Sequence, residues 1–216
     1  MSGEEKKPRR AKPALGAKER EARRAAILAA ALDTFSQHGF GATRLEDVAR
    51  AAGIAKGTLY LYFPHKQALF EAIVKDTISP VLADAAGLLP NFQGETRELL
   101  ALIADMLISR ILEGPGSGIM RLMIAEGPRF PELATFHHRE VVSRGMALIR
   151  AVMERGLARG EITSDAAMRF PQMVFAPALT SVVWNSVFGH LSPLDARAFI
   201  HAYMEVLLRG LGGRAP

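Results

Sequence analysis

The sequence contains no cysteine, which excludes disulfide bonds, thiolate nucleophiles and cysteine-based zinc sites. It also lacks an apolar run long enough to span a bilayer, because Pro177, Asn185 and small polar residues interrupt the richest stretch, residues 173–188. No apolar segment follows the basic N-terminal residues, so a secretory signal is not expected. These absences fit a reducing compartment, and we expect a soluble cytoplasmic protein with no membrane partner.

Signals for catalysis and metal binding are missing as well. Serine, histidine and acidic residues do not fall in a nucleophile motif, and the glycine-rich residues 114–118 follow a predicted helix and lack the lysine of a phosphate-binding loop. His137 and Glu140 have helical spacing for a shared metal, but a tight site needs a third ligand and none is visible. We therefore expect no enzyme activity, no metal and no cofactor.

The chain is instead rich in apolar residues, and its charge is unevenly distributed. Hydrophobic residues make up 49% of the 216 residues, which is typical of a globular protein with one large core or two small ones. The net charge is +5, and residues 6–24 carry nine lysines and arginines against two glutamates. Residues 1–16 are expected to form a flexible basic arm, which either follows DNA phosphates or is simply a solvated tail.

Beyond this arm the pattern is helical almost throughout, with no alternation long enough to indicate a sheet. Apolar spacing predicts helices over residues 17–38, 43–52, 55–63, 66 to a break near Pro80, 95–112, 117–126, 131–159, 164–188 and 193–209. The predicted fold class is all-α. It comprises an N-terminal three-helix helix-turn-helix domain over residues 17–65 and a C-terminal helical effector-binding and dimerisation domain over residues 66–216.

Local signals mark several helix ends. Gly39 supplies a left-handed stop for the first helix, and Phe40 is expected to pack back on its last turn. Thr43 and Glu46 have the spacing of a capping box at the start of the second helix.

Proline marks the later helix boundaries. Ser192 followed by Pro193 indicates the start of the last helix. Pro171 and Pro177 are expected to kink or interrupt the helix over residues 164–188, and such breaks leave room for a cavity.

Residues 43–63 have the pattern of a helix-turn-helix. A short helix ends at Gly53, Ile54 is the apolar residue expected inside the turn, and a second short helix follows. Leu59 and Phe63 are four residues apart and face the core, which leaves lysine, threonine and tyrosine side chains for phosphates and base edges. On spacing alone, an ordinary helical hairpin with two surface tyrosines fits equally well.

A longer stretch, from Ala25 to Lys75, resembles the DNA-binding domain of the TetR family, the tetracycline-repressor type. The resemblance rests on AALDTF (residues 30–35), GFGAT (39–43), VARAAGI (48–54) and GTLYLYFPHK (57–66). It implies a homodimeric transcriptional regulator that binds palindromic double-stranded operator DNA.

The resemblance also implies DNA contacts. Thr43 and Lys66 would bind phosphates, Lys66 with help from the dipole of the helix that it opens, and Arg44 would reach a base. The helix after the turn would supply three major-groove residues followed by two tyrosines on the DNA backbone: Lys56, Gly57, Thr58, Tyr60 and Tyr62.

Two positions depart from the TetR pattern. Ala55 replaces a common serine or threonine, so the third helix loses a cap worth roughly 1 kcal/mol. His65 replaces a frequent serine, which leaves its phosphate contact open or makes that contact dependent on pH.

Residues 120–162 resemble the C-terminal domain of AefR-like members, through RLMIAE (residues 121–126) and RFPEL (129–133). Methionine and aromatic residues are abundant in this half. Most of these residues are expected to lie in the core. Some of them are expected to line a cavity for a largely apolar, aromatic or acyl effector. Arg121, His137 and Asn185 are the candidate polar anchors, and the apolar candidates are Met106, Met123, Met146, Phe170, Met173, Phe175, Trp184 and Phe188.

The last two long helices are expected to form the dimer interface. Residues 181–188 are apolar nearly all round, and the last helix carries a second apolar stripe. The candidate interface residues are Val182, Val183, Phe199, Tyr203, Val206 and Leu207.

The function that the sequence favours is a repressor released from its operator by a small effector, with the helix that begins at Lys66 as the lever between the domains. Two alternatives stay open: a DNA-binding regulator that needs no small molecule, and, more remotely, a helical enzyme that modifies small molecules.

Overall fold

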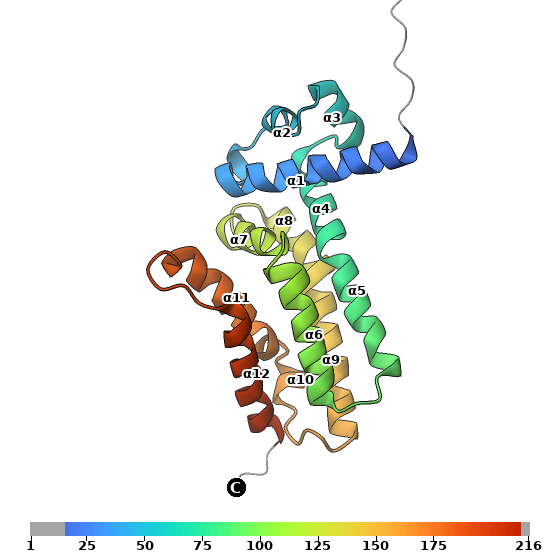
Figure 1. Ribbon diagram of the computed structural model, residues 1–216, viewed down its shortest axis with the longest axis vertical. Coiled ribbons are helices and arrows are strands. Elements are labelled where there is room, and N and C mark those ends of the chain that lie inside the picture. The colour runs from blue at the N-terminus through green and yellow to red at the C-terminus, as the bar shows by residue number, and fades with distance from the viewer. Residues whose placement is uncertain (1–15, 213–216) are drawn as a thin grey trace, which may run out of the picture.

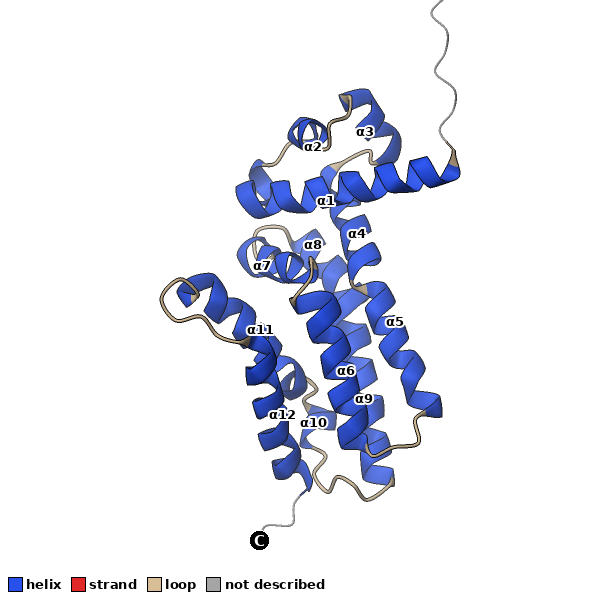
Figure 2. Ribbon diagram, in the orientation of Figure 1, coloured by secondary structure: helices blue, strands red, loops and turns tan. Residues whose placement is uncertain are grey.

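The computed structural model describes residues 16–212, and this part of the chain is helical without strands (Figure 1, Figure 2). The all-α prediction is confirmed. Except for Gly16, the expected basic arm lies outside the described residues, and its role stays a prediction. No helix within residues 16–212 is both long and apolar enough to cross a membrane.

The N-terminal helices are α1 (Ala17–Ala42), α2 (Leu45–Ala51) and α3 (Lys56–Tyr62). α1 lies across one end of the molecule, with α2 and α3 on its outer side (Figure 1). Gly39 interrupts the helical path of α1 with a φ of +76°, and the ring of Phe40 returns to Phe35 at 5.3 Å between centroids. The expected stop at Gly39, with Phe40 packed on the last turn, is confirmed.

The chain then passes into α4 (Lys66–Thr77) and α5 (Ser79–Leu88), which are separated at Ile78, two residues before Pro80. The elements that follow are a 3-10 turn (Leu89–Asn91), α6 (Thr96–Leu107), a π-helical turn (Ile108–Leu112), α7 (Gly116–Glu126), α8 (Pro131–His137), a second π-helical turn (His138–Val142), α9 (Ser143–Ala158), α10 (Ala166–Arg169), α11 (Gln172–Phe188) and α12 (Ala196–Gly212). α5, α6 and α9 run along the long axis, and α11 pairs with α12 on the opposite flank (Figure 2).

Two predicted boundaries near the C-terminus have different outcomes. The helix over residues 164–188 is interrupted at Pro171, as expected, although Pro177 is accommodated inside α11. The last helix does not begin at Pro193. Asp195 caps α12 instead, because its carboxylate accepts a hydrogen bond from the N–H of Ala198 at 3.0 Å.

Two apolar cores hold these helices. The first joins α1, α2 and α3 to α4, α5, α7 and α8, and includes Phe35, Phe70 and Leu133. The second joins α6, α9 and α12. Because the first core crosses the boundary proposed at residue 65, the helix-turn-helix does not pack as an isolated unit.

Candidate DNA-binding surface and effector cavity

The turn between α2 and α3 is built on Gly53. Its φ is +64°, a conformation that favours glycine, and the N–H of Ile54 donates to the carbonyl of Ala49 at 3.0 Å. Leu59 is fully buried beneath α3, so the opposite face of α3 is turned away from the core. α2 and α3 therefore have the arrangement of a helix-turn-helix, with α3 in the place of the recognition helix.

Most of the predicted DNA contacts are accessible to solvent. Arg44, Lys56, Gly57 and Tyr60 are exposed, and the side chains of Thr58 and Tyr62 are half-buried. A Cβ added to Gly57 would meet no atom within 4 Å, so the backbone there is open to an approaching duplex. The contacts of these residues with DNA stay predictions.

Lys56 is already paired within the protein. Its Nζ lies 2.5 Å from Oε1 of Glu46, and this interaction raises the pKa of Lys56 and lowers that of Glu46. An exposed pair of this kind contributes little to stability. Lys56 can therefore exchange Glu46 for a base or phosphate at small cost.

The structure corrects the role expected of Thr43. The side chain is only 3% exposed, and its hydroxyl donates to the carbonyl of Gly39 at 2.7 Å, so it closes the end of α1 and has no access to phosphate. The capping box with Glu46 is also wrong. Arg44 occupies the cap position of α2, and its N–H donates to the carboxylate of Asp47 at 3.3 Å.

Lys66 is bound within the protein, and its contact with phosphate stays a prediction. Nζ donates to the carbonyl oxygens of Phe40 at 2.7 Å and Gly41 at 2.8 Å, and a third carbonyl, of Thr43, lies at 3.4 Å. Lys66 thus fastens the start of α4 to the end of α1. His65 caps α4, because its Nδ1 accepts a hydrogen bond from the N–H of Ala68 at 3.1 Å.

Sequence reasoning missed one residue of α3. Leu61 is 86% exposed between Tyr60 and Tyr62. Leu61 lies outside the buried stripe of Leu59 and Phe63, and helical spacing alone could have shown that it faces solvent. An exposed leucine on the recognition helix is suited to contact with a thymine methyl group.

The helix-turn-helix is joined to the C-terminal domain at the end of α7. Glu126 lies so close to Gly39 that a Cβ there would be 2.5 Å from its Oε1, and Phe130 lies against Gly41, where a Cβ would be 3.1 Å from its Cζ. The rings of Phe130 and Phe40 meet edge to face, with centroids 5.0 Å apart. We call the contact of Glu126 and Phe130 with residues 39–41 the junction.

An apolar cavity of about 540 Å³ lies below the junction, inside the C-terminal domain. Helices on several sides contribute to its wall: Ile78 and Leu82 near the α4–α5 break, Met120, Met123 and Ile124 of α7, Gly145 and Met146 of α9, and Phe175, Ala178 and Leu179 of α11. A cavity of this size falls in the range of small-molecule sites.

Both π-helical turns border this cavity. Ile111 and Leu112 come from the first, and Val141 and Val142 from the second. A π-helical turn widens a helix locally and is frequent at functional sites. Gly145 lets the Phe175 ring of α11 approach α9 closely, since a Cβ there would lie 3.0 Å from Cζ of that ring.

Four of the predicted effector residues line the cavity: Met123, His137, Met146 and Phe175. Met106 packs instead against the second core, and Met173 does not border the cavity. Phe170, Trp184 and Phe188 are exposed.

Two of the three candidate anchors also lie elsewhere. Arg121 and Asn185 border a separate hollow of about 370 Å³ between α7 and α11. Both ends of the Asn185 amide bind the backbone of Leu194, and the indole N–H of Trp184 donates to the carbonyl of Ser192 at 2.7 Å. Asn185 and Trp184 therefore hold the loop between α11 and α12.

His137 is the one predicted anchor at the cavity. Its Nδ1 is buried and has no hydrogen-bond partner among the described residues. Burial lowers the pKa of His137 to about 4, with repulsion from His138 as a smaller cause. The ring is therefore neutral at pH 7 and has one N–H donor and one acceptor nitrogen. Among the described residues, the second polar side chain in the wall is that of Gln172, whose amide can donate and accept hydrogen bonds.

α11 and α12 present an apolar surface to solvent. Val183 and Val206 are exposed, the latter by 72%, and Phe199, Tyr203 and Leu207 are half-buried. Val182 is an exception, since it is buried in its own protomer and does not face outward.

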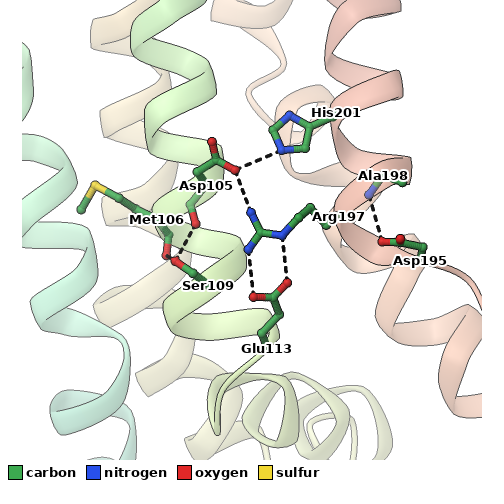
Figure 3. Close-up of polar contacts among 8 residues, drawn as sticks. All are labelled: Asp105, Met106, Ser109, Glu113, Asp195, Arg197, Ala198 and His201. Carbon is green, nitrogen blue, oxygen red and sulfur yellow. Dashed lines mark hydrogen bonds and ion pairs between the residues drawn. The ribbon is translucent and has the colours of Figure 1, made fainter.

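A polar network fixes α12 against α6 (Figure 3). The guanidinium of Arg197 donates to Asp105 at 3.0 Å and to both carboxylate oxygens of Glu113, and Nε2 of His201 lies 3.0 Å from Asp105. The hydrogen bond from Arg197 lowers the pKa of Glu113. This network holds the exposed stripe of α12 in a fixed orientation.

Comparison with known proteins gives two family matches. The model described as bacterial regulatory proteins, tetR family, matches residues 27–73, and that described as tetracyclin repressor-like, C-terminal domain, matches residues 92–207. The HTH-type transcriptional regulator RutR of Escherichia coli O157:H7 is 46% identical over 137 residues, which is 62% of this chain and 64% of RutR. The chain therefore aligns with slightly less than two thirds of that relative.

Solved structures share the fold at low identity. FadR of Bacillus subtilis in complex with stearoyl-CoA has a TM-score of 0.68 at 20% identity, over 87% of this chain and 98% of FadR. The SmeT–triclosan complex has a TM-score of 0.75 at 20% identity, over 90% and 93%; SmeT is the repressor of a Stenotrophomonas maltophilia multidrug efflux pump. The AefR-like resemblance stays a prediction.

Proposed function

The chain belongs to the TetR family of bacterial transcriptional regulators, and from this premise we propose that it is a homodimeric repressor that leaves a palindromic operator when a small apolar effector fills its cavity. The observation that carries this proposal is that α7 borders the cavity and also ends at the junction. Ligand binding and DNA binding would then favour different positions of α7, so each would weaken the other.

Two helices connect the cavity with the helix-turn-helix. α7 contributes Met123 and Ile124 to the wall and contacts the end of α1 one turn later. α4, the lever expected from sequence, is followed directly by Ile78 on the cavity wall and is fastened to α1 by Lys66. A ligand that displaces either helix changes the separation of the two recognition helices in the dimer, and a coupling of about 1–3 kcal/mol is typical.

Dimerisation through α11 and α12 is supported by their exposed apolar side chains, which a monomer would leave in water. Two protomers are needed because one helix-turn-helix reads few base pairs, whereas a two-fold dimer matches two half-sites.

The structural neighbours support a ligand-responsive repressor over a regulator without a ligand. FadR and SmeT were solved with stearoyl-CoA and triclosan, and SmeT is a repressor. The relative RutR is a transcriptional regulator, which supports a function without catalysis.

The test begins with selection of bound sequences from random duplex DNA by the full chain. The proposal predicts a palindrome with half-sites about one or more helical turns apart. Apolar compounds that raise the melting temperature of the protein should then weaken its binding to this DNA. If every stabilising compound left DNA affinity unchanged, the chain would be a regulator without effector release.

A further inference from the structure

The wall of the effector cavity carries no ionic group. Within the described residues it contains aliphatic side chains, methionine, one phenylalanine, small residues, and the polar side chains of Gln172 and His137, with no lysine, arginine, aspartate or glutamate. A charged ligand would lose its hydration here without gaining an opposite charge.

His137 is placed to bind a hydrogen-bonding group. It ends α8 where the second π-helical turn begins, and the residue borders the cavity. Its Nδ1 is covered by neighbouring atoms and has no partner among the described residues. A buried polar atom without a partner is unfavourable, so a turn of the ring that brings a nitrogen to a ligand hydroxyl removes this cost. Because the ring is neutral at pH 7, it can both donate and accept, but it offers no charge to an anion.

The neighbouring histidine has a different environment. Nδ1 of His138 lies 3.3 Å from the hydroxyl of Ser143, the ring is exposed, and it does not border the cavity. His138 is therefore a matched control for His137.

We propose that the effector is an uncharged, largely apolar molecule with a hydroxyl or similar group that shares a hydrogen bond with His137, and that carboxylates and amines of the same shape are rejected. This rests on the proposed function, in that the cavity is the effector site, and adds the chemical class of the ligand. Gln172, at the exposed start of α11, is the second polar group that such a ligand can meet.

The experiment compares binding of 2-naphthol, naphthalene and 2-naphthoate to the full chain at pH 7.5 by calorimetry, without DNA. The three probes share one ring system. 2-Naphthol carries a hydroxyl group, naphthalene has no polar group, and 2-naphthoate carries a negative charge. We expect 2-naphthoate to bind at least about tenfold more weakly than 2-naphthol. The preference for 2-naphthol over naphthalene should fall by about two- to tenfold in His137→Leu and stay unchanged in His138→Leu.

His137→Gln keeps a donor and an acceptor, and should retain part of the preference even where His137→Leu is poorly folded. Equal binding of 2-naphthoate and 2-naphthol, or a preference that His137→Leu leaves intact, overturns the inference about ligand class. Absence of binding by all three probes overturns it as well. Release of DNA by a bound probe is measured separately, so failure of release counts against the repressor mechanism alone.

Discussion

The ring of Phe130, in the turn after α7, meets the ring of Phe40, at the end of α1, edge to face at 5.0 Å between centroids and an interplanar angle of 72°. This pair joins the C-terminal domain, which holds the cavity, to the helix-turn-helix domain. Edge-to-face pairs have a preferred geometry, so we expect movement of α7 to be passed to residues 39–41.

A substitution of Lys66 distinguishes a role in binding backbone carbonyls of α1 from a role in binding DNA phosphate. Lys66→Met keeps the aliphatic stem and removes the hydrogen bonds to backbone carbonyls, so it should lower the free energy of unfolding by about 1–3 kcal/mol. The salt dependence of DNA binding should not change. A stable variant whose salt slope drops by about one unit would establish the phosphate role.

Arg44 and Lys56 are expected to read bases. Arg44→Ala and Lys56→Ala should each cost about 1–3 kcal/mol of binding at particular base pairs, whereas Tyr60→Phe should weaken all sequences alike. Fluorescence anisotropy with the selected DNA and with single-base variants measures both. Equal losses on selected and random DNA for all three variants would contradict the assignment.

The dimer interface is tested at exposed positions of α11 and α12. Val183→Asp and Val206→Asp place a charge in the proposed interface, and sedimentation at micromolar concentration should show folded monomers with much weaker DNA binding. Leu61→Asp is the control, because it places the same charge at an exposed leucine of α3. It should stay dimeric. A wild-type chain that sediments as a monomer rules out the interface.

Acid should destabilise the protein through His137. The pKa of this group is 6.5 when unperturbed and about 4 in the fold. Between these values the unfolded chain binds a proton that the folded protein does not bind. The stability present above pH 6.5 is therefore lost as the pH falls toward 4, by about 3 kcal/mol over the whole window.

His137→Leu should lose less stability over this interval than the wild-type chain. His138→Leu should stay close to the wild type, because repulsion from His138 is only the smaller cause of the lowered pKa. Urea unfolding at pH 7 and pH 4.5 measures the difference. Parallel losses in wild type and His137→Leu would show that the ring is not buried in its neutral form.

The helix-turn-helix could be predicted from sequence because its signals are local. Gly39 and Gly53 each adopt a positive φ at a helix end, and Leu59 follows helical spacing. These features depend on neighbours within a few residues. The end of α1 shows the limit of such reasoning, since the hydroxyl of Thr43 binds Gly39 and Lys66 binds carbonyls more than twenty residues away.

The cavity could be predicted in kind but not in its lining. Phe175 and Trp184 are both aromatic residues of α11, yet one borders the cavity and the other is exposed. Nine residues separate them, which places them on opposite faces of the helix. Which of the two faces borders the cavity depends on the orientation of α11 against α7, and that is a property of tertiary packing. The π-helical turns that widen the wall also leave no clear pattern in the sequence.

Release of DNA through the junction when the cavity is occupied is measured by the affinity for selected DNA with and without saturating 2-naphthol. The wild-type chain should bind this DNA at least about fivefold more weakly with the probe. Phe130→Ala should keep its affinity for the probe and lose most of this difference, while Phe92→Ala, a half-buried phenylalanine outside the junction, keeps it. If Phe130→Ala released DNA as fully as the wild type, the account would be contradicted.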